Sequence, residues 1–217
     1  MFELFFVSGL RPDPLLWQQH NPWLVALSLL VSMGASAVAL HLAGQARDMA
    51  HRRTRQMALL AGALALGCGV WTMHYIGMLA FAVCGQARFD PWVTLLSVLP
   101  ALGASWVALH LLVRERVGPG ALAGSGLLVG AGIGAMHYIG MAASELAPLM
   151  RYDARGFALS IAVAVLLAIL ALWVRFGLQR HWRAPQGWVT ALAGCVMGLA
   201  IAGMHYTGMA ALRFVEP

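Results

Sequence analysis

The apolar residues of this chain fall into six blocks of about 20 residues, separated by short polar segments. A block of this length crosses the hydrocarbon core of a bilayer as a helix. Backbone groups left unpaired in lipid are too costly, so each block has to be helical. The sequence therefore predicts an all-α membrane protein with six transmembrane helices, at residues 22–44, 57–82, 92–113, 121–143, 157–177 and 188–212.

The composition excludes an ordinary soluble domain. Charged residues make up only 10% of the 217 residues, whereas they supply about a quarter of a soluble domain. Residues 1–20 are too short to span and lack the cleavage site of a signal peptide, so we expect an N-terminal interfacial segment there. A nucleic-acid partner would need a basic groove with aromatic residues, and the sequence shows none. The expected partner is the lipid bilayer.

The positions of the basic residues predict the orientation. All 14 are arginines, and those in the segments after the first, third and fifth spans are accompanied only by Asp48 and Glu115. The positive-inside rule puts these segments in the cytoplasm and both termini outside. The arginines concerned are Arg47, Arg52, Arg53, Arg55, Arg114, Arg116, Arg175, Arg180 and Arg183.

The six spans form three copies of one two-helix unit. The copies share Asn21, Asp90 and Asp153 at their starts, Ser28, Ser97 and Ser160 seven residues later, and His41, His110 and Trp173 thirteen residues further on. We therefore expect a domain at 21–217 with repeats at 21–89, 90–152 and 153–217. Each repeat crosses the membrane twice, so the three should be parallel and related by a pseudo-threefold axis along the membrane normal.

The second helix of each copy carries the motif Met-His-Tyr-x-Gly-Met, at 73–78, 136–141 and 204–209. Its depth along the helix predicts that all three motifs lie in the outer leaflet, near the periplasmic face. An ionisable side chain inside the membrane marks a functional site by default. Three parallel helices can bring their imidazoles together on the axis, so His74, His137 and His205 are the first candidate metal ligands.

Imidazole binds zinc, copper, iron and nickel, whereas thioether sulfur selects Cu(I). Copper is therefore expected first, ahead of zinc or haem. The second methionine of each motif shares a helix face with the histidine, which favours Met78, Met141 and Met209 over Met73, Met136 and Met204. The hydroxyls of Tyr75, Tyr138 and Tyr206 can orient a ligand. One shared site, several sites, and a metal-free packing cluster remain alternatives.

Other candidate ligands fit less well. The cysteines occupy different places in the repeat and predict neither a disulfide nor a metal pair; they are Cys68, Cys84 and Cys195. The third copy has Trp173 where the others have His41 and His110, so these two are expected to be interfacial. The remaining histidines are expected to be solvated: His20, His51 and His181.

The tripled motif and the paired helices resemble the MHYT family of bacterial membrane sensor domains over nearly the whole chain. The resemblance implies an inner-membrane module that binds copper near the outer face and senses oxygen, carbon monoxide or nitric oxide. By position it implies Met73, His74, Met136, His137, Met204 and His205 as ligands, with the tyrosines beside them. Only the third copy keeps the motif threonine, Thr207; Ile76 and Ile139 replace it elsewhere, so that position is no required ligand.

Family members are often fused to cytoplasmic domains that make or degrade cyclic di-GMP. This chain stops at Pro217, so we expect a truncated sensory module or a stand-alone protein whose signalling domain is supplied by a partner. The expected function is a metal-binding sensor and not an enzyme, because no nucleophile with a base, phosphate loop or intramembrane carboxylate pair is visible. The alternatives are a haem-binding electron-transfer protein, a copper transporter, or a copper-dependent membrane oxidase.

Overall fold

The computed structural model describes residues 6, 20–81, 88–113, 118–177 and 185–214. Most of the predicted interfacial segment lies outside these residues. So do Cys84, His181, Arg114, Arg116, Arg180 and Arg183.

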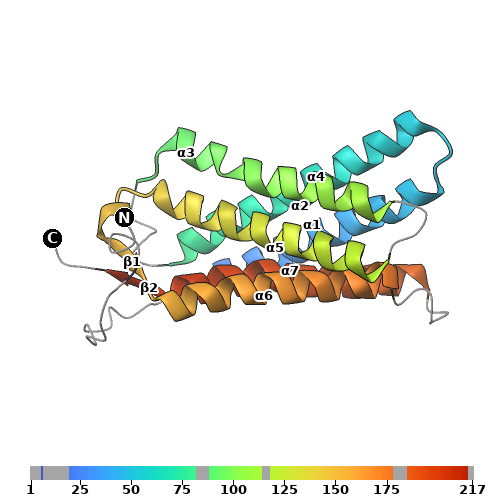
Figure 1. Ribbon diagram of the computed structural model, residues 1–217. Helices are drawn as coiled ribbons and strands as arrows, with labels where there is room; N and C mark the ends of the chain where they lie inside the picture. Colours follow the sequence, from blue (N-terminus) through green and yellow to red (C-terminus); the bar gives the residue numbers. More distant parts are fainter. Residues whose placement is uncertain (1–5, 7–19, 82–87, 114–117, 178–184, 215–217) are drawn as a thin grey trace.

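Six helices of this structure are long and apolar enough to cross a membrane, which confirms the six predicted spans (Figure 1). Four of them are continuous: α1 (Pro22–Asp48), α2 (Arg52–Ala80), α5 (Pro119–Ala142) and α7 (Gln186–Ala210). The fifth span consists of α6 (Ala154–Leu172) and a π-helical turn, η4 (Trp173–Gly177). Arg175, expected among the loop arginines, instead lies in this turn with a buried side chain.

The third span was expected as one helix, but it is broken into α3 (Pro91–Leu96) and α4 (Val98–Leu112). Pro100 explains the break at Ser97. Proline has no N–H to donate, and its ring clashes with the carbonyl four residues earlier, which here belongs to Leu96. The signal for this interruption was therefore present in the sequence.

The shared first residue of each repeat is a helix N-cap. The side chains of Asn21 and Asp90 each accept hydrogen bonds from two backbone N–H groups at 2.9–3.4 Å, and Asp153 accepts one from Gly156 at 2.8 Å. Such caps satisfy donors that a helix start leaves unpaired. Proline at the next position suits the first two helices, because it needs no donor there.

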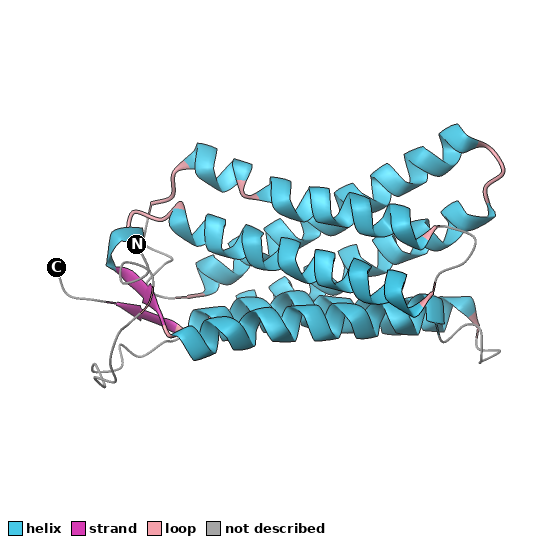
Figure 2. Cartoon of the chain, viewed as in Figure 1, coloured by secondary structure: helices cyan, strands magenta, loops and turns pink. Residues whose placement is uncertain are grey.

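The helices pack as an inner set, α2, α5 and α7, and an outer set, α1, α4 and α6. In the most apolar stretch of each inner helix, 56% of the residues are buried. In the corresponding stretches of the outer spans, 28–39% are buried. Each outer helix lies between two inner ones: α1 contacts α2 and α7, α4 contacts α2 and α5, and α6 contacts α5 and α7. Figure 2 shows the helices running along a common direction. The pseudo-threefold axis itself remains a prediction.

Each repeat is closed at the motif end by one backbone hydrogen bond. The N–H groups of Asn21, Asp90 and Asp153 donate to the carbonyls of Ala80, Ala143 and Ala211 at 2.8–2.9 Å. Each of these alanines follows its motif histidine by six residues. The start of the outer helix is thus tied to the end of the inner helix that carries the motif.

A small antiparallel sheet at the same end was not predicted. Strand β1 (Met150–Tyr152), preceded by the short helix η3 (Ala147–Leu149), pairs with β2 (Leu212–Phe214), and Arg151 faces Arg213. Figure 1 shows both strands at the end of the bundle where α3 begins. Three residues are too few to show the period-two pattern by which a strand is recognised in sequence.

Candidate metal centre

The three motif histidines meet in the interior of the bundle. His74 on α2, His137 on α5 and His205 on α7 point their Nδ1 atoms at one another, at distances of 3.1, 3.1 and 3.2 Å. Their side chains are 4%, 1% and 1% exposed. The rings stand nearly perpendicular to one another, with interplanar angles of 81–87°. These residues, 63–131 positions apart in the chain, form one compact buried cluster.

Protons alone cannot satisfy this triangle. Each Nδ1 is either a donor, when it carries hydrogen, or an acceptor, when it carries a lone pair. A hydrogen bond needs one of each, and three mutually adjacent atoms of two kinds always include one like pair. At least one Nδ1–Nδ1 contact is therefore donor against donor or acceptor against acceptor. A single cation inside the triangle would engage all three lone pairs together.

The triangle also has the right size for an ion. Its centre lies about 1.8 Å from each Nδ1, and zinc–imidazole bonds are about 2.0–2.1 Å long. A small outward shift of each ring, or a position slightly off the plane, gives normal bonds. Within the described residues, these three histidines are the group of His, Cys, Asp and Glu side chains arranged to hold a metal ion.

The motif glycines explain how the imidazoles fit. The Nε2 side of each ring lies against the glycine of another inner helix: His74 against Gly140, His137 against Gly208, and His205 against Gly77. A Cβ at Gly140 or Gly208 would stand only 2.5 or 2.8 Å from the facing Nε2. Glycine at these positions lets the imidazole approach closely, with Nδ1 on the side of the ring that faces the other two histidines. Nε2 of His137 is buried and makes no hydrogen bond within the described residues.

The six motif methionines are all at most 1% exposed, in two apolar clusters. The first methionine of each motif belongs to the main core, and the second belongs to a smaller cluster at the motif end with Phe81, Met150, Tyr152 and Leu212. The first set comprises Met73, Met136 and Met204, and the second comprises Met78, Met141 and Met209. Both clusters neighbour the histidines along the helices and place apolar side chains on either side of them.

Two of the motif tyrosines form a hydrogen bond with a serine and not with an imidazole. The two serines occupy the same position in their repeats. Tyr138 and Ser160 are joined at 2.8 Å, and Tyr206 and Ser28 at 2.9 Å. The tyrosine rings lie edge-on to His137 and His205, at centroid distances of 4.8 Å. These tyrosines therefore tie an inner helix to an outer helix and pack against the histidine of the same motif.

The first copy departs from this pattern. Tyr75 makes no hydrogen bond with Ser97 and stacks on Trp71, whose indole N–H donates to the Thr94 carbonyl at 2.8 Å. Thr94 lies in α3, just before the break caused by Pro100. A cavity of about 10 Å³ is left here, lined in part by His74, Tyr75 and Ser97. A volume of this size holds about one water-sized molecule.

The other candidates lie away from the cluster, with one exception. His41 and His110 are exposed at the opposite end of the bundle, and the described cysteines, Cys68 and Cys195, are free thiols. His20 was expected to be solvated, but it is half-buried between Phe81 and Tyr206, with ring centroids 5.2 and 5.7 Å away. His20 directly precedes the N-cap of its repeat, where the other two copies have Phe89 and Tyr152. All three rings lie against a motif tyrosine, so the aromatic residue at this repeat position was a signal for the contact.

Comparison with known proteins identifies the family of the chain. The family described as the bacterial signalling protein N-terminal repeat, MHYT, matches residues 11–55, 67–125, 130–187 and 198–217. The chain belongs to the MHYT family. As an MHYT protein it is a multi-pass membrane sensor domain of the kind found in bacterial signalling proteins.

Relatives of this MHYT chain are much longer proteins. It is 45% identical over 200 residues to the bifunctional diguanylate cyclase/cyclic di-GMP phosphodiesterase MucR of Pseudomonas aeruginosa, covering 92% of this chain and 29% of that protein. It is 36% identical over 199 residues to the cyclic di-GMP phosphodiesterase NbdA of the same organism, covering 91% and 25%. The signaling protein YkoW of Bacillus subtilis is 29% identical over 200 residues, covering 90% and 24%. No solved structure matches the chain.

Proposed function

We propose that His74, His137 and His205 bind one transition-metal ion through their Nδ1 atoms, and that this ion is copper. The triangle of Nδ1 atoms 3.1–3.2 Å apart carries the proposal. The donor set supports copper, because imidazole and thioether groups surround the site and thioether sulfur favours Cu(I). The acidic side chains of the described residues lie at helix ends or in turns, at Asp48, Asp90, Glu145 and Asp153.

We further propose that the bundle is a non-enzymatic input module that senses a diatomic gas and signals to a cytoplasmic domain of cyclic di-GMP metabolism. Three protein ligands leave a metal position open for a small ligand, as in other three-ligand sites. A cavity of about 10 Å³ next to His74 and Gly140 has room for about one water-sized molecule. The output is inferred from the relatives, two of which are described as cyclic di-GMP enzymes.

Geometry disfavours two of the alternatives, haem binding and copper transport. Two axial haem histidines bind opposite faces of a macrocycle with nitrogens about 4 Å apart, whereas these nitrogens are 3.1–3.2 Å apart with no space for a ring. Transport would need a second ligand cluster at the other end of the bundle. The described residues there include His41 and His110, which are exposed and belong to no metal-binding group.

Metal analysis of protein purified without added metal tests this function. About one copper per chain is expected, with copper exceeding zinc. Reduced protein exposed to carbon monoxide should show a C–O infrared band shifted from that of the free gas. Zinc in excess of copper, or a haem Soret band, would contradict the copper assignment. Copper without any shifted C–O band would leave the metal site standing and count against gas sensing.

We propose an orientation in the bacterial inner membrane with the histidines toward the periplasm. The arginine-rich end of the bundle supports this, because basic segments stay in the cytoplasm. A reporter active only in the periplasm should be active when inserted at Glu145, in the turn after α5, and silent when inserted before Arg52. The reverse pattern would place the metal centre at the cytoplasmic side.

A further inference from the structure

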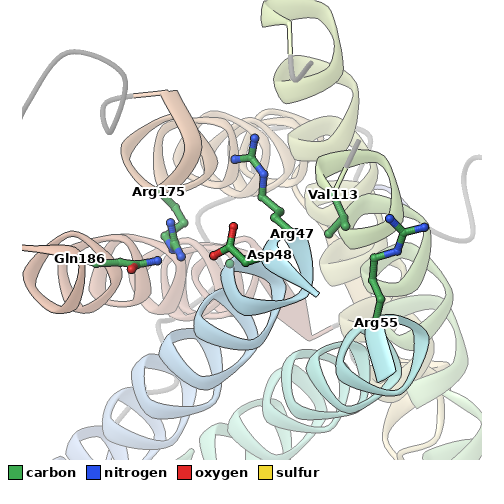
Figure 3. A pocket seen from close by; sticks show the side chains of 7 residues that line it. Arg47, Asp48, Arg55, Val113, Arg175 and Gln186 are labelled. Carbon is green, nitrogen blue, oxygen red and sulfur yellow. The ribbon is translucent and has the colours of Figure 1, made fainter. Parts of the chain in front are cut away.

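The end of the bundle opposite the histidines contains a polar pocket of about 390 Å³. Its walls come from all three repeats: the end of α1, the first turn of α2, the residue after α4, the π-helical turn η4 and the start of α7. Figure 3 shows Arg175 and Gln186 on one side of the pocket and Arg55 on the other. Its volume is in the range of small-molecule binding sites.

Arg175 breaks the repeat pattern at this pocket. The register that aligns His41, His110 and Trp173 places Arg175 where the first two copies have Ala43 and Leu112. All three positions are buried, at 0%, 0% and 1% exposure. Two repeats thus place an apolar side chain where the third places a guanidinium. An arginine buried within a membrane span is costly and marks a functional position by default.

The local structure is shaped to hold this arginine. A Cβ added at Gly44 of α1 would overlap the Arg175 guanidinium, so α1 leaves room for it by having glycine there. The guanidinium carbon also lies 5.1 Å from the centroid of the Phe176 ring. Arg175 sits in η4, where the π-helical turn changes the direction of side chains relative to a regular helix. The charge is therefore directed into the pocket region by its surroundings.

The charges around the pocket do not cancel. Among the described residues, Arg47, Arg55 and Arg175 line it together with one carboxylate, Asp48, and these four side chains carry a formal net charge of +2. Arg47 and Arg55 are exposed at the opening, whereas Arg175 is buried. A half-open pocket with this excess of guanidinium groups attracts a compact anion carrying more than one oxygen.

We propose that this pocket binds a phosphate group, held by the guanidinium groups of Arg47, Arg55 and Arg175, with the Gln186 amide as a further donor. Guanidinium presents a planar fork of N–H donors that matches two phosphate oxygens, which a point charge does not. The pocket lies at the end of the spans, at the depth of lipid headgroups, and also opens to water. The phosphate group can therefore belong to an anionic phospholipid or to a soluble phosphate.

The test uses the whole chain in nanodiscs with two separate probes. In the first arm, phosphatidylglycerol replaces part of the phosphatidylcholine, and lipid retained by the protein is measured by native mass spectrometry. In the second arm, inorganic phosphate is titrated in phosphatidylcholine nanodiscs, with 31P NMR as the readout. Saturable binding in the first arm identifies a lipid headgroup, and saturable binding in the second identifies a soluble phosphate; either result supports the pocket.

Arg55→Gln is the main variant, because Arg55 is exposed and its loss leaves the core intact. It should weaken binding about tenfold, since one charge-assisted hydrogen-bonding partner is removed. Arg53→Gln is the matched control, because Arg53 is exposed on the same helical turn but does not line the pocket. Arg175→Lys keeps the charge but loses the fork and should also weaken binding. Equal losses in Arg53→Gln and Arg55→Gln, or no saturable binding in either arm, would overturn the proposal.

Discussion

Replacing any one of His74, His137 or His205 by alanine is expected to remove most of the bound metal. Losing a residue that only orients a ligand costs about 10–100-fold in metal affinity, so losing one of three ligands should cost at least as much. Occupancy should fall from about one ion per chain to below roughly a tenth after purification in a competing chelator. The measurement is metal per chain, alongside thermal unfolding in detergent to show that each variant is folded.

His110→Ala is the control for these variants, because His110 is exposed at the far end of the bundle. Its metal content should match that of the unmodified chain. Asparagine at position 137 serves as a milder replacement if the alanine variant unfolds. If the three histidines serve independent sites, each single variant will keep about two thirds of the metal. That result would rule out one shared ion.

Substituting Gly140 by alanine is expected to disturb the metal centre without touching a ligand. The new Cβ would stand 2.5 Å from Nε2 of His74, which is closer than such atoms approach in folded proteins. The imidazole must move, and its Nδ1 leaves the triangle. We expect metal affinity to fall about tenfold or more. The strain should also lower the free energy of unfolding by about 1–3 kcal/mol.

Gly124→Ala gives a matched comparison within the same helix. Gly124 also lies in α5, and a Cβ there would meet no atom within 4 Å. This variant should keep its metal, with the free energy of unfolding changed by no more than about 1 kcal/mol. Equal metal losses in the two variants would mean that α5 responds to any added methyl group. Retention of full affinity in Gly140→Ala would show that the glycine is not needed to position His74.

The sequence predicted the spans because their length and hydropathy follow directly from the bilayer. It also predicted that the three histidines come together, because the three motifs lie at one depth on parallel helices. The repeat register carried further information: Asn21, Asp90 and Asp153 are the N-caps, and Ser28 and Ser160 are the partners of Tyr206 and Tyr138. Repetition was therefore the most useful signal, because the cap position has the same structural role in all three copies and the tyrosine–serine pair recurs in two.

What the sequence did not predict is where the repeats differ. Pro100 breaks only the third span, and Tyr75, unlike the other two tyrosines, does not bond to its serine. Arg175 was counted as a loop charge, although its alignment with Ala43 and Leu112 could have marked it as buried. The choice between the two methionine sets also remains a prediction, because both sets are buried and both neighbour the histidines along the helix.

X-ray absorption at the copper edge of the loaded, purified chain tests the central claim most directly. The triangle of Nδ1 atoms predicts three imidazole nitrogens bound to one ion at about 2.0 Å. A longer sulfur contribution that disappears in Met141→Leu but persists in Met136→Leu would assign the second methionine of the motif. A first shell with fewer than three imidazole nitrogens would contradict the account of a single ion shared by His74, His137 and His205.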